Sequence, residues 1–171
     1  MAETPYWNAF LPALLDRLSF HMRKNLTKTV EPYGLNSSHA IYILALRVQN
    51  GQTTAGLSRF LDIDNANTHR VLKVLKEKGI VYDDRIDPRS KKYHVYLTDY
   101  GKELADMISD LVEGIDMAYS AGLTPEEISV TRNAVLKIMG NALYSETDSK
   151  DLKFDKPYYS YLAELAAKND G

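Results

Sequence analysis

The sequence predicts a mainly α-helical protein that carries one small β-hairpin. Apolar residues recur at the three- and four-residue spacing of helices through most of the chain. Capping residues, prolines and glycines divide these segments. The spacing changes only once, between Ile80 and Leu97, to the alternation that is typical of strands. The 171 residues are enough for one domain with a core of its own.

The first predicted helix covers about residues 5–31. Pro5 suits the first helical position, because proline lacks the N–H that would stay unbonded there. Pro12 interrupts the pattern and can kink the helix. The helix is expected to end at Pro32 and Gly34, since proline disfavours helix in the residue before it.

Two shorter helices are expected next. Ser37 or Ser38 can cap the second helix, because a hydroxyl accepts hydrogen bonds from N–H groups of the first turn. Thr53 or Thr54 can start the third helix in the same way.

The fourth helix, from Asn65 to Lys78, ends at Gly79, a residue suited to a left-handed C-cap. Residues 80–82 and 93–97 then alternate as two strands, joined by a polar loop over residues 85–92.

Two closing helices follow the hairpin. Thr98 can cap a helix over residues 99–119, and residues 124–127 have the sequence of a capping box for a helix that ends near Leu143. We therefore expect one domain over residues 1–144. Residues 145–171 are expected to form a separate tail with a short amphipathic helix.

The order of the elements is that of a winged helix-turn-helix, whose second helix enters the DNA major groove. Apolar or small residues on one face of the fourth helix, Thr68, Val71, Leu72 and Leu75, would anchor it to the core. Asparagine can read adenine and arginine can read guanine, whereas lysine more often meets phosphate. The expected DNA-binding residues are Asn65, Ala66, Asn67, His69, Arg70 and Lys73 on the helix, with Arg85, Arg89 and Lys91 in the loop. The alternative is an ordinary solvated helix face.

The charge distribution favours the same segment. The chain has a net charge of −2, which by itself does not suggest nucleic-acid binding. Residues 53–98 hold nine Lys and Arg against six Asp and Glu, a net +3, so the remaining residues carry −5. The basic part of the chain is therefore the part with the helix-turn-helix pattern.

From about Leu35 to Leu143 the chain resembles the MarR family of bacterial and archaeal transcription regulators. The resemblance rests on residues 57–63, on residues 68–81 with their Leu-x-x-x-Gly-Ile-Val ending, and on the Leu-Thr-x-x-Gly of residues 97–101. It implies a homodimer that binds a palindromic double-stranded DNA operator, acting as a repressor released by a small ligand.

The loop departs from the family pattern. The family's Asp-x-Arg pair falls on Arg89 and Lys91 when residues 79–97 are aligned without gaps, whereas Asp87 and Arg89 have the right letters two positions earlier. Acidic Asp83 stands where the family often has a basic residue. Which loop residue enters the minor groove is therefore left open.

The resemblance also implies a dimerisation layer, formed by helices 5–31 and 99–143, beside a DNA-binding lobe over residues 37–98. Apolar side chains expected at a dimer interface are Tyr6, Phe10, Leu14, Ile128, Val135, Leu136, Met139 and Leu143. The alternative is that they close the core of the monomer.

Family members often bind phenolic or anionic effectors between these two parts. The candidate ligand residues here are His21, Arg23, Tyr33, His39 and Tyr42, which offer aromatic walls and a cation. Each could equally be a packing or surface residue.

Several function classes find no support in the sequence. The absence of cysteine excludes disulfides, thiolate zinc sites and iron–sulfur clusters. No nucleotide-binding or hydrolase motif is present, so we expect no enzyme, no cofactor and no metal site. No apolar stretch approaches the ~18 residues of a membrane span, and the N-terminus lacks signal-peptide features, so a cytoplasmic protein is expected. The second candidate function is a winged-helix module for protein–protein interaction without sequence-specific DNA binding.

Overall fold

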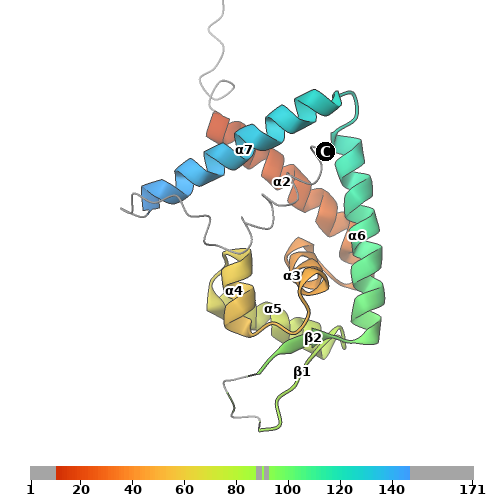
Figure 1. Ribbon diagram of the computed structural model, residues 1–171. Helices are drawn as coiled ribbons and strands as arrows, with labels where there is room; N and C mark the ends of the chain where they lie inside the picture. The colour runs from red at the N-terminus through yellow and green to blue at the C-terminus, as the bar shows by residue number, and fades with distance from the viewer. Residues whose placement is uncertain (1–10, 88–89, 91–92, 147–171) are drawn as a thin grey trace, which may run out of the picture.

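The computed structural model describes residues 11–87, 90 and 93–146, and for residues 140–146 the description is limited to the backbone. Within these residues the predicted order of helices and hairpin is confirmed (Figure 1). The elements are α2 (Leu11–Val30), the 3-10 helix η1 (Glu31–Tyr33), α3 (Ser37–Val48), α4 (Thr54–Leu61), α5 (Asn65–Glu77), β1 (Val81–Asp83), β2 (Val95–Leu97), α6 (Asp99–Tyr119) and α7 (Pro125–Glu146).

Helix α3 is the centre of the molecule. It contacts α2 and α6 as well as α4, α5 and β2. Figure 1 shows α4, α5 and the hairpin at one end, and α2 and α7 at the other, with α6 running between the two ends along one side. The largest fully buried side chains belong to the core around α3: Tyr42, Ile43, Leu46, Leu57, Leu75, Ile80 and Ile108. This single core also includes Val30 of α2 and Leu104 of α6, so it joins the hairpin end of the molecule to both long helices.

The start of α3 differs from the prediction. Its N-cap is Asn36, and neither Ser37 nor Ser38 has that role. The Asn36 side chain accepts a hydrogen bond from the backbone N–H of His39 at 3.0 Å, and the backbone N–H of Asn36 donates to Nδ1 of His39 at 3.1 Å. An asparagine–histidine pair thus satisfies both N–H groups, as Ser and Glu do in the usual capping box.

The hairpin is a two-stranded antiparallel sheet in which Val81 pairs with Leu97 and Asp83 with Val95. Val81, Val95 and Leu97 are buried against the helices. Because successive residues of a strand face opposite sides, Tyr82 lies on the outer face, where its ring stacks on Tyr96 with the centroids 5.4 Å apart. The two strands predicted from the alternating pattern are therefore present, with Val81, Val95 and Leu97 on their inner face.

The two closing helices begin at the predicted residues. The Thr98 side chain caps α6, and Thr124 and Glu127 form the capping box that starts α7. Helix α7 continues to Glu146, so the domain boundary expected at residue 144 falls inside it. The start of the first helix before Leu11 and the amphipathic helix of the tail lie outside the described residues.

Candidate nucleic-acid interface

Helix α5 begins at a well-formed cap. The carboxylate of Asp64 accepts a hydrogen bond from the backbone N–H of Asn67 at 2.8 Å, and the Thr68 hydroxyl donates to the backbone carbonyl of Asp64 at 3.0 Å. Asp62, with a left-handed φ of 53°, makes the turn between α4 and α5. The acidic residue at the start of α5 is thus used by the helix itself, where its charge also suits the helix dipole.

The side chains of α5 divide into three faces. Thr68, Val71, Leu72 and Leu75 are buried, as the helical spacing predicted. Ala66 and Arg70 are exposed, and Asn67 is half-buried. The third face borders a groove beside the hairpin and carries Asn65, His69, Lys73 and Lys76. The structure therefore leaves exposed or partly exposed every helix residue that was expected to reach DNA, but it separates them onto two faces.

The groove lies between the start of α4, the length of α5 and the hairpin, and has a volume of about 800 Å³. Its polar wall is the third face of α5, with the hydroxyls of Thr53 and Thr54 at its end. Its opposite wall is the hairpin, with Arg85, Tyr82 and Tyr93. Sequence reasoning named Thr53 and Thr54 only as helix starts and did not name the tyrosines, because lining a groove depends on how the hairpin folds back over α5.

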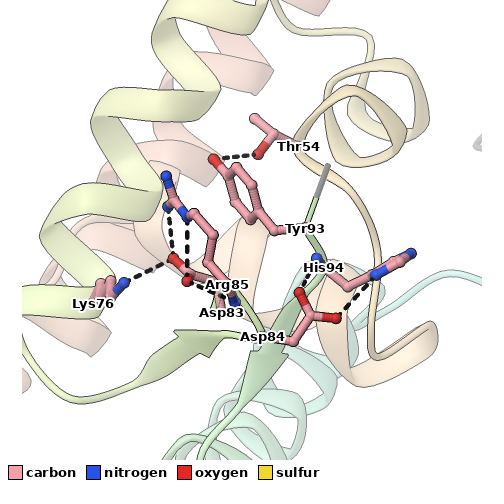
Figure 2. Close-up of polar contacts among 7 residues, drawn as sticks. All are labelled: Thr54, Lys76, Asp83, Asp84, Arg85, Tyr93 and His94. Atoms are coloured by element: carbon pink, nitrogen blue, oxygen red, sulfur yellow. Dashed lines mark hydrogen bonds and ion pairs between the residues drawn. The ribbon is translucent and has the colours of Figure 1, made fainter. Parts of the chain in front are cut away.

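Asp83, the last residue of β1, connects the hairpin to α5 (Figure 2). Its Oδ2 accepts from Nζ of Lys76 at 2.7 Å and from an Nη of Arg85 at 2.8 Å. The guanidinium of Arg85 also lies over the Tyr93 ring, 3.8 Å from its centroid. The Tyr93 hydroxyl in turn meets that of Thr54 at 3.2 Å. One carboxylate therefore starts a chain of contacts that joins α5, the hairpin and α4.

The electrostatics agree with this geometry. The hydrogen bond from Arg85, supported by Lys76, lowers the pKa of Asp83 from 3.8 to about 2. The same hydrogen bond with Asp83 raises the pKa of Arg85 above its ordinary value. Asp83 is therefore ionised at neutral pH, and one carboxylate between two basic side chains gives the cluster a formal net charge of +1.

A second contact closes the hairpin further along. The Asp84 carboxylate accepts from the backbone N–H of His94 at 2.7 Å and lies 3.2 Å from Nδ1 of the same residue. The hydrogen bond from the His94 backbone N–H is the main reason why the pKa of Asp84 lies below its ordinary value. The two adjacent aspartates thus have different partners: Asp83 faces the groove and Asp84 spans the hairpin.

The expected cations of the loop are only partly placed. Arg85 is engaged with Asp83 and Tyr93, and 26% of its side chain is exposed, so it is not the extended cation that the loop pattern suggested. Arg89 and Lys91 lie outside the described residues, so their DNA contacts remain predictions.

The five ligand candidates are not gathered in one site. Tyr42 is fully buried, with its hydroxyl 2.8 Å from that of Thr68. His39 belongs to the α3 capping box, and burial together with the charge of Lys78 lowers its pKa. His21 and Tyr33 are exposed. Arg23 borders a groove of about 370 Å³, which is lined by Phe20, Arg23, Lys24, Thr27, Lys28 and Ser37.

No helix in the described part of the chain is long and apolar enough to cross a membrane. Among the same residues, no group of three or more His, Asp or Glu side chains is arranged to hold a metal ion.

Comparison with known proteins identifies the fold. No protein-family model matches the chain, and no curated protein matches it. A MarR transcriptional regulator from Methanosarcina mazei is 25% identical, and the match covers 79% of this chain and 97% of that one with a TM-score of 0.68. The MepR–DNA complex from Staphylococcus aureus is 16% identical, covers 78% and 96% of the two chains, and has a TM-score of 0.69. A MarR-family regulator from Silicibacter pomeroyi is 21% identical, with 86% and 97% covered and a TM-score of 0.67. The chain therefore has the winged-helix fold seen in MarR-family regulators, in which α4 and α5 are the two helices of the helix-turn-helix and the hairpin is the wing.

Proposed function

We propose that this chain is a homodimeric transcription regulator that binds a specific double-stranded DNA sequence and acts as a repressor released by a small ligand. The observation that carries the proposal is that α5 has one buried face and other faces that are exposed. Its core face is buried, while its other faces present Asn65, His69, Arg70 and Lys73 beside a wing. Amide and guanidinium groups at the start of such a helix suit base edges, and lysines further along suit phosphates.

The similar structures support the same function. The match to MepR is a match to a DNA complex, and the other two proteins are transcriptional regulators. None of the three is described as an enzyme, which agrees with a role in regulation rather than catalysis.

Selection of bound duplexes from a random DNA pool tests the proposal. We expect enrichment of a palindromic motif, because a two-fold dimer presents two recognition helices to half-sites about 34–36 Å apart. Affinity for the selected duplex is expected to fall steeply with salt, with a log–log slope of about −0.9 for each phosphate contact. Absence of enrichment together with salt-insensitive binding would instead favour the protein-interaction module.

Dimerisation is proposed through the end of the molecule opposite the wing. Helix α2 exposes five large apolar side chains there: Leu11, Leu14, Leu18, Phe20 and Met22. Helix α7 adds the exposed side chain of Val130. Of the candidate interface residues, Leu14 is exposed, whereas Ile128, Val135, Leu136 and Met139 are half-buried. Tyr6 and Phe10 lie outside the described residues, as does the side chain of Leu143. Several large apolar side chains exposed along one helix are typical of a protein interface. Sedimentation equilibrium at micromolar concentration is expected to give the mass of a dimer, and a stable monomer would refute this part of the proposal.

We place the effector in the groove beside α2. Arg23, Lys24 and Lys28 surround it and Phe20 adds an aromatic edge, which suits a small aromatic acid. With benzoate as the probe, we expect release of the operator duplex by the wild type and a weaker response in Arg23→Gln. Arg17→Gln is the matched control, because Arg17 is an exposed arginine on the same helix that does not line this groove. An equal benzoate response in both variants would remove Arg23 from the site.

A further inference from the structure

Two cations at the base of the wing, Lys76 and Arg85, form ion pairs with the same carboxylate. Asp83 has only 8% of its side chain exposed, and it binds Lys76 of α5 and Arg85 of the wing with the same carboxylate oxygen. Its Oδ1 also lies 3.4 Å from Nε and from the backbone N–H of Arg85. The contacts are short and come from two elements, so they fix the wing relative to α5 rather than only balancing charge.

The chain provides an internal comparison on the same helix. Lys73 lies three residues before Lys76 and lines the same groove, but 78% of its side chain is exposed. Its acidic neighbour, Glu77, is itself largely exposed and stands 3.9 Å away, which is a weak surface pair. Lys73 therefore keeps its charge available to a phosphate, whereas that of Lys76 is directed at Asp83.

We propose that Asp83 determines specificity by positioning: it clamps the wing to the recognition helix and withholds the charges of Lys76 and Arg85 from sequence-independent attraction to phosphate. The inference rests on the proposed function. Non-specific affinity depends on the number of phosphates that cations neutralise, whereas discrimination depends on helix and wing keeping one register on the bases. Asp83 holds two cations that could otherwise neutralise phosphates, and it also fixes the position of the wing relative to the helix. We therefore expect it to lower non-specific affinity more than specific affinity.

The wall that Asp83 organises extends beyond the two cations. Arg85 is held over Tyr93, and Tyr93 reaches the first residue of α4, Thr54. The three residues all line the groove. If Asp83 loses its charge, Arg85 loses the carboxylate that it binds in Figure 2, and we expect the groove wall to loosen.

The test is a set of salt titrations by fluorescence anisotropy, on an operator selected by the wild type and on a scrambled duplex. Asp83→Asn raises the charge of the cluster from +1 to +2 with almost no change of shape. We expect tighter binding to the scrambled duplex by about threefold or more, and a slope steeper by about 0.9 for each cation released. The ratio of specific to scrambled affinity is expected to fall by about tenfold. Asp83→Glu, which keeps the charge, is expected to restore the slope.

Asp84→Asn is the matched control, since it removes the same charge one residue along, from a carboxylate bonded to His94. We expect a smaller change in both duplexes and no steeper slope. The lysines give a test that does not depend on altering the wing. Lys73→Gln is expected to flatten the slope by about 0.9 and Lys76→Gln to leave it nearly unchanged.

Two results would overturn the inference. One is an equal loss of affinity for both duplexes in Asp83→Asn with an unchanged slope, which is the result of a structural role alone. The other is equal flattening by the two lysine variants. If the wild type binds neither duplex in a salt-dependent way, the DNA-binding proposal fails. The clamp itself can then still be measured without DNA, as protection of the Arg85 Nε–H from solvent exchange by NMR that is lost in Asp83→Asn.

Discussion

The hydroxyl of Tyr42 lies 2.8 Å from that of Thr68 and links α3 to the first turn of α5. The Thr68 hydroxyl donates its proton to the Asp64 carbonyl, so it must accept from Tyr42. Burial raises the pKa of Tyr42, which keeps its hydroxyl protonated as the donor. The start of α5 is therefore fixed by a buried hydrogen bond as well as by apolar packing.

Because Tyr42 donates this hydrogen bond and Thr68 accepts it, removing one hydroxyl is expected to lower the free energy of unfolding by a different amount than removing the other. Tyr42→Phe leaves Thr68 bonded to Asp64, and we expect a loss of about 1 kcal/mol in the free energy of unfolding. Thr68→Val leaves the fully buried Tyr42 hydroxyl without its partner, and we expect a larger loss, up to about 3 kcal/mol. The double variant should cost less than the sum of the two. Urea unfolding measures all three, and a larger loss in Tyr42→Phe would show that the direction is wrong.

A second prediction concerns Gly101, where α6 passes the start of the wing. A Cβ there would lie 2.1 Å from the carbonyl oxygen of Ile80. That oxygen cannot move freely, because it accepts from the backbone N–H and the hydroxyl of Thr98 at 3.0 and 3.2 Å. Gly101→Ala is therefore expected to destabilise the fold by about 2 kcal/mol or more.

Gly114 on the same helix is the control for that substitution. No described atom lies within 4 Å of a Cβ at this position, so Gly114→Ala is expected to stabilise α6 by up to about 1 kcal/mol through helix propensity. Thermal unfolding of the two variants compares them directly. Equal destabilisation by both would contradict the steric explanation.

The sequence was sufficient for most features that depend on neighbours along the chain, although the cap of α3 was misplaced by one or two residues. The buried face of α5 with Val71 and Leu72 follows from helical spacing, and the caps at Thr98 and Thr124 follow from residue type. The clash at Gly101 also explains physically why glycine belongs in the Leu-Thr-x-x-Gly segment.

The sequence was insufficient wherever a partner comes from another element. Tyr42 was proposed as a ligand residue, because aromatic side chains near the junction of the first two helices can form the wall of a ligand site. The partner of its hydroxyl, Thr68, is 26 residues away. Arg85 was expected to be a cation of the wing facing DNA. Its pairing with Asp83 and its position over Tyr93 depend on how the hairpin folds back on α5. Charge counting along the chain cannot show which of several nearby acids neutralises which base.

The lowered pKa of Asp83 predicts how the contribution of this residue to stability depends on pH. Because the folded value of about 2 lies below the unfolded value near 3.8, the carboxylate stabilises the fold fully above pH 4. The contribution falls as the pH drops through this interval and is lost below about pH 2. At neutral pH it is at most about 2 kcal/mol. Urea unfolding of the wild type and Asp83→Asn from pH 7 to pH 2 should therefore give converging curves, and a gap independent of pH would contradict the ionic origin.

Arg70 gives the sharpest test of base reading. It is exposed on α5, on a different face from the groove-lining Lys73, and a guanidinium there suits guanine O6 and N7. Arg70→Ala is expected to cost about 1–3 kcal/mol on the selected operator and little on scrambled DNA, so that discrimination relaxes at one base-pair position of each half-site.

Arg89→Ala is the comparison, because a cation that meets phosphate or the minor groove generically should weaken binding to every sequence by a similar factor. Anisotropy titrations on single-base operator variants separate the two patterns. If Arg70→Ala weakens all duplexes equally, Arg70 contacts the backbone; if it changes none of them, Arg70 lies outside the interface.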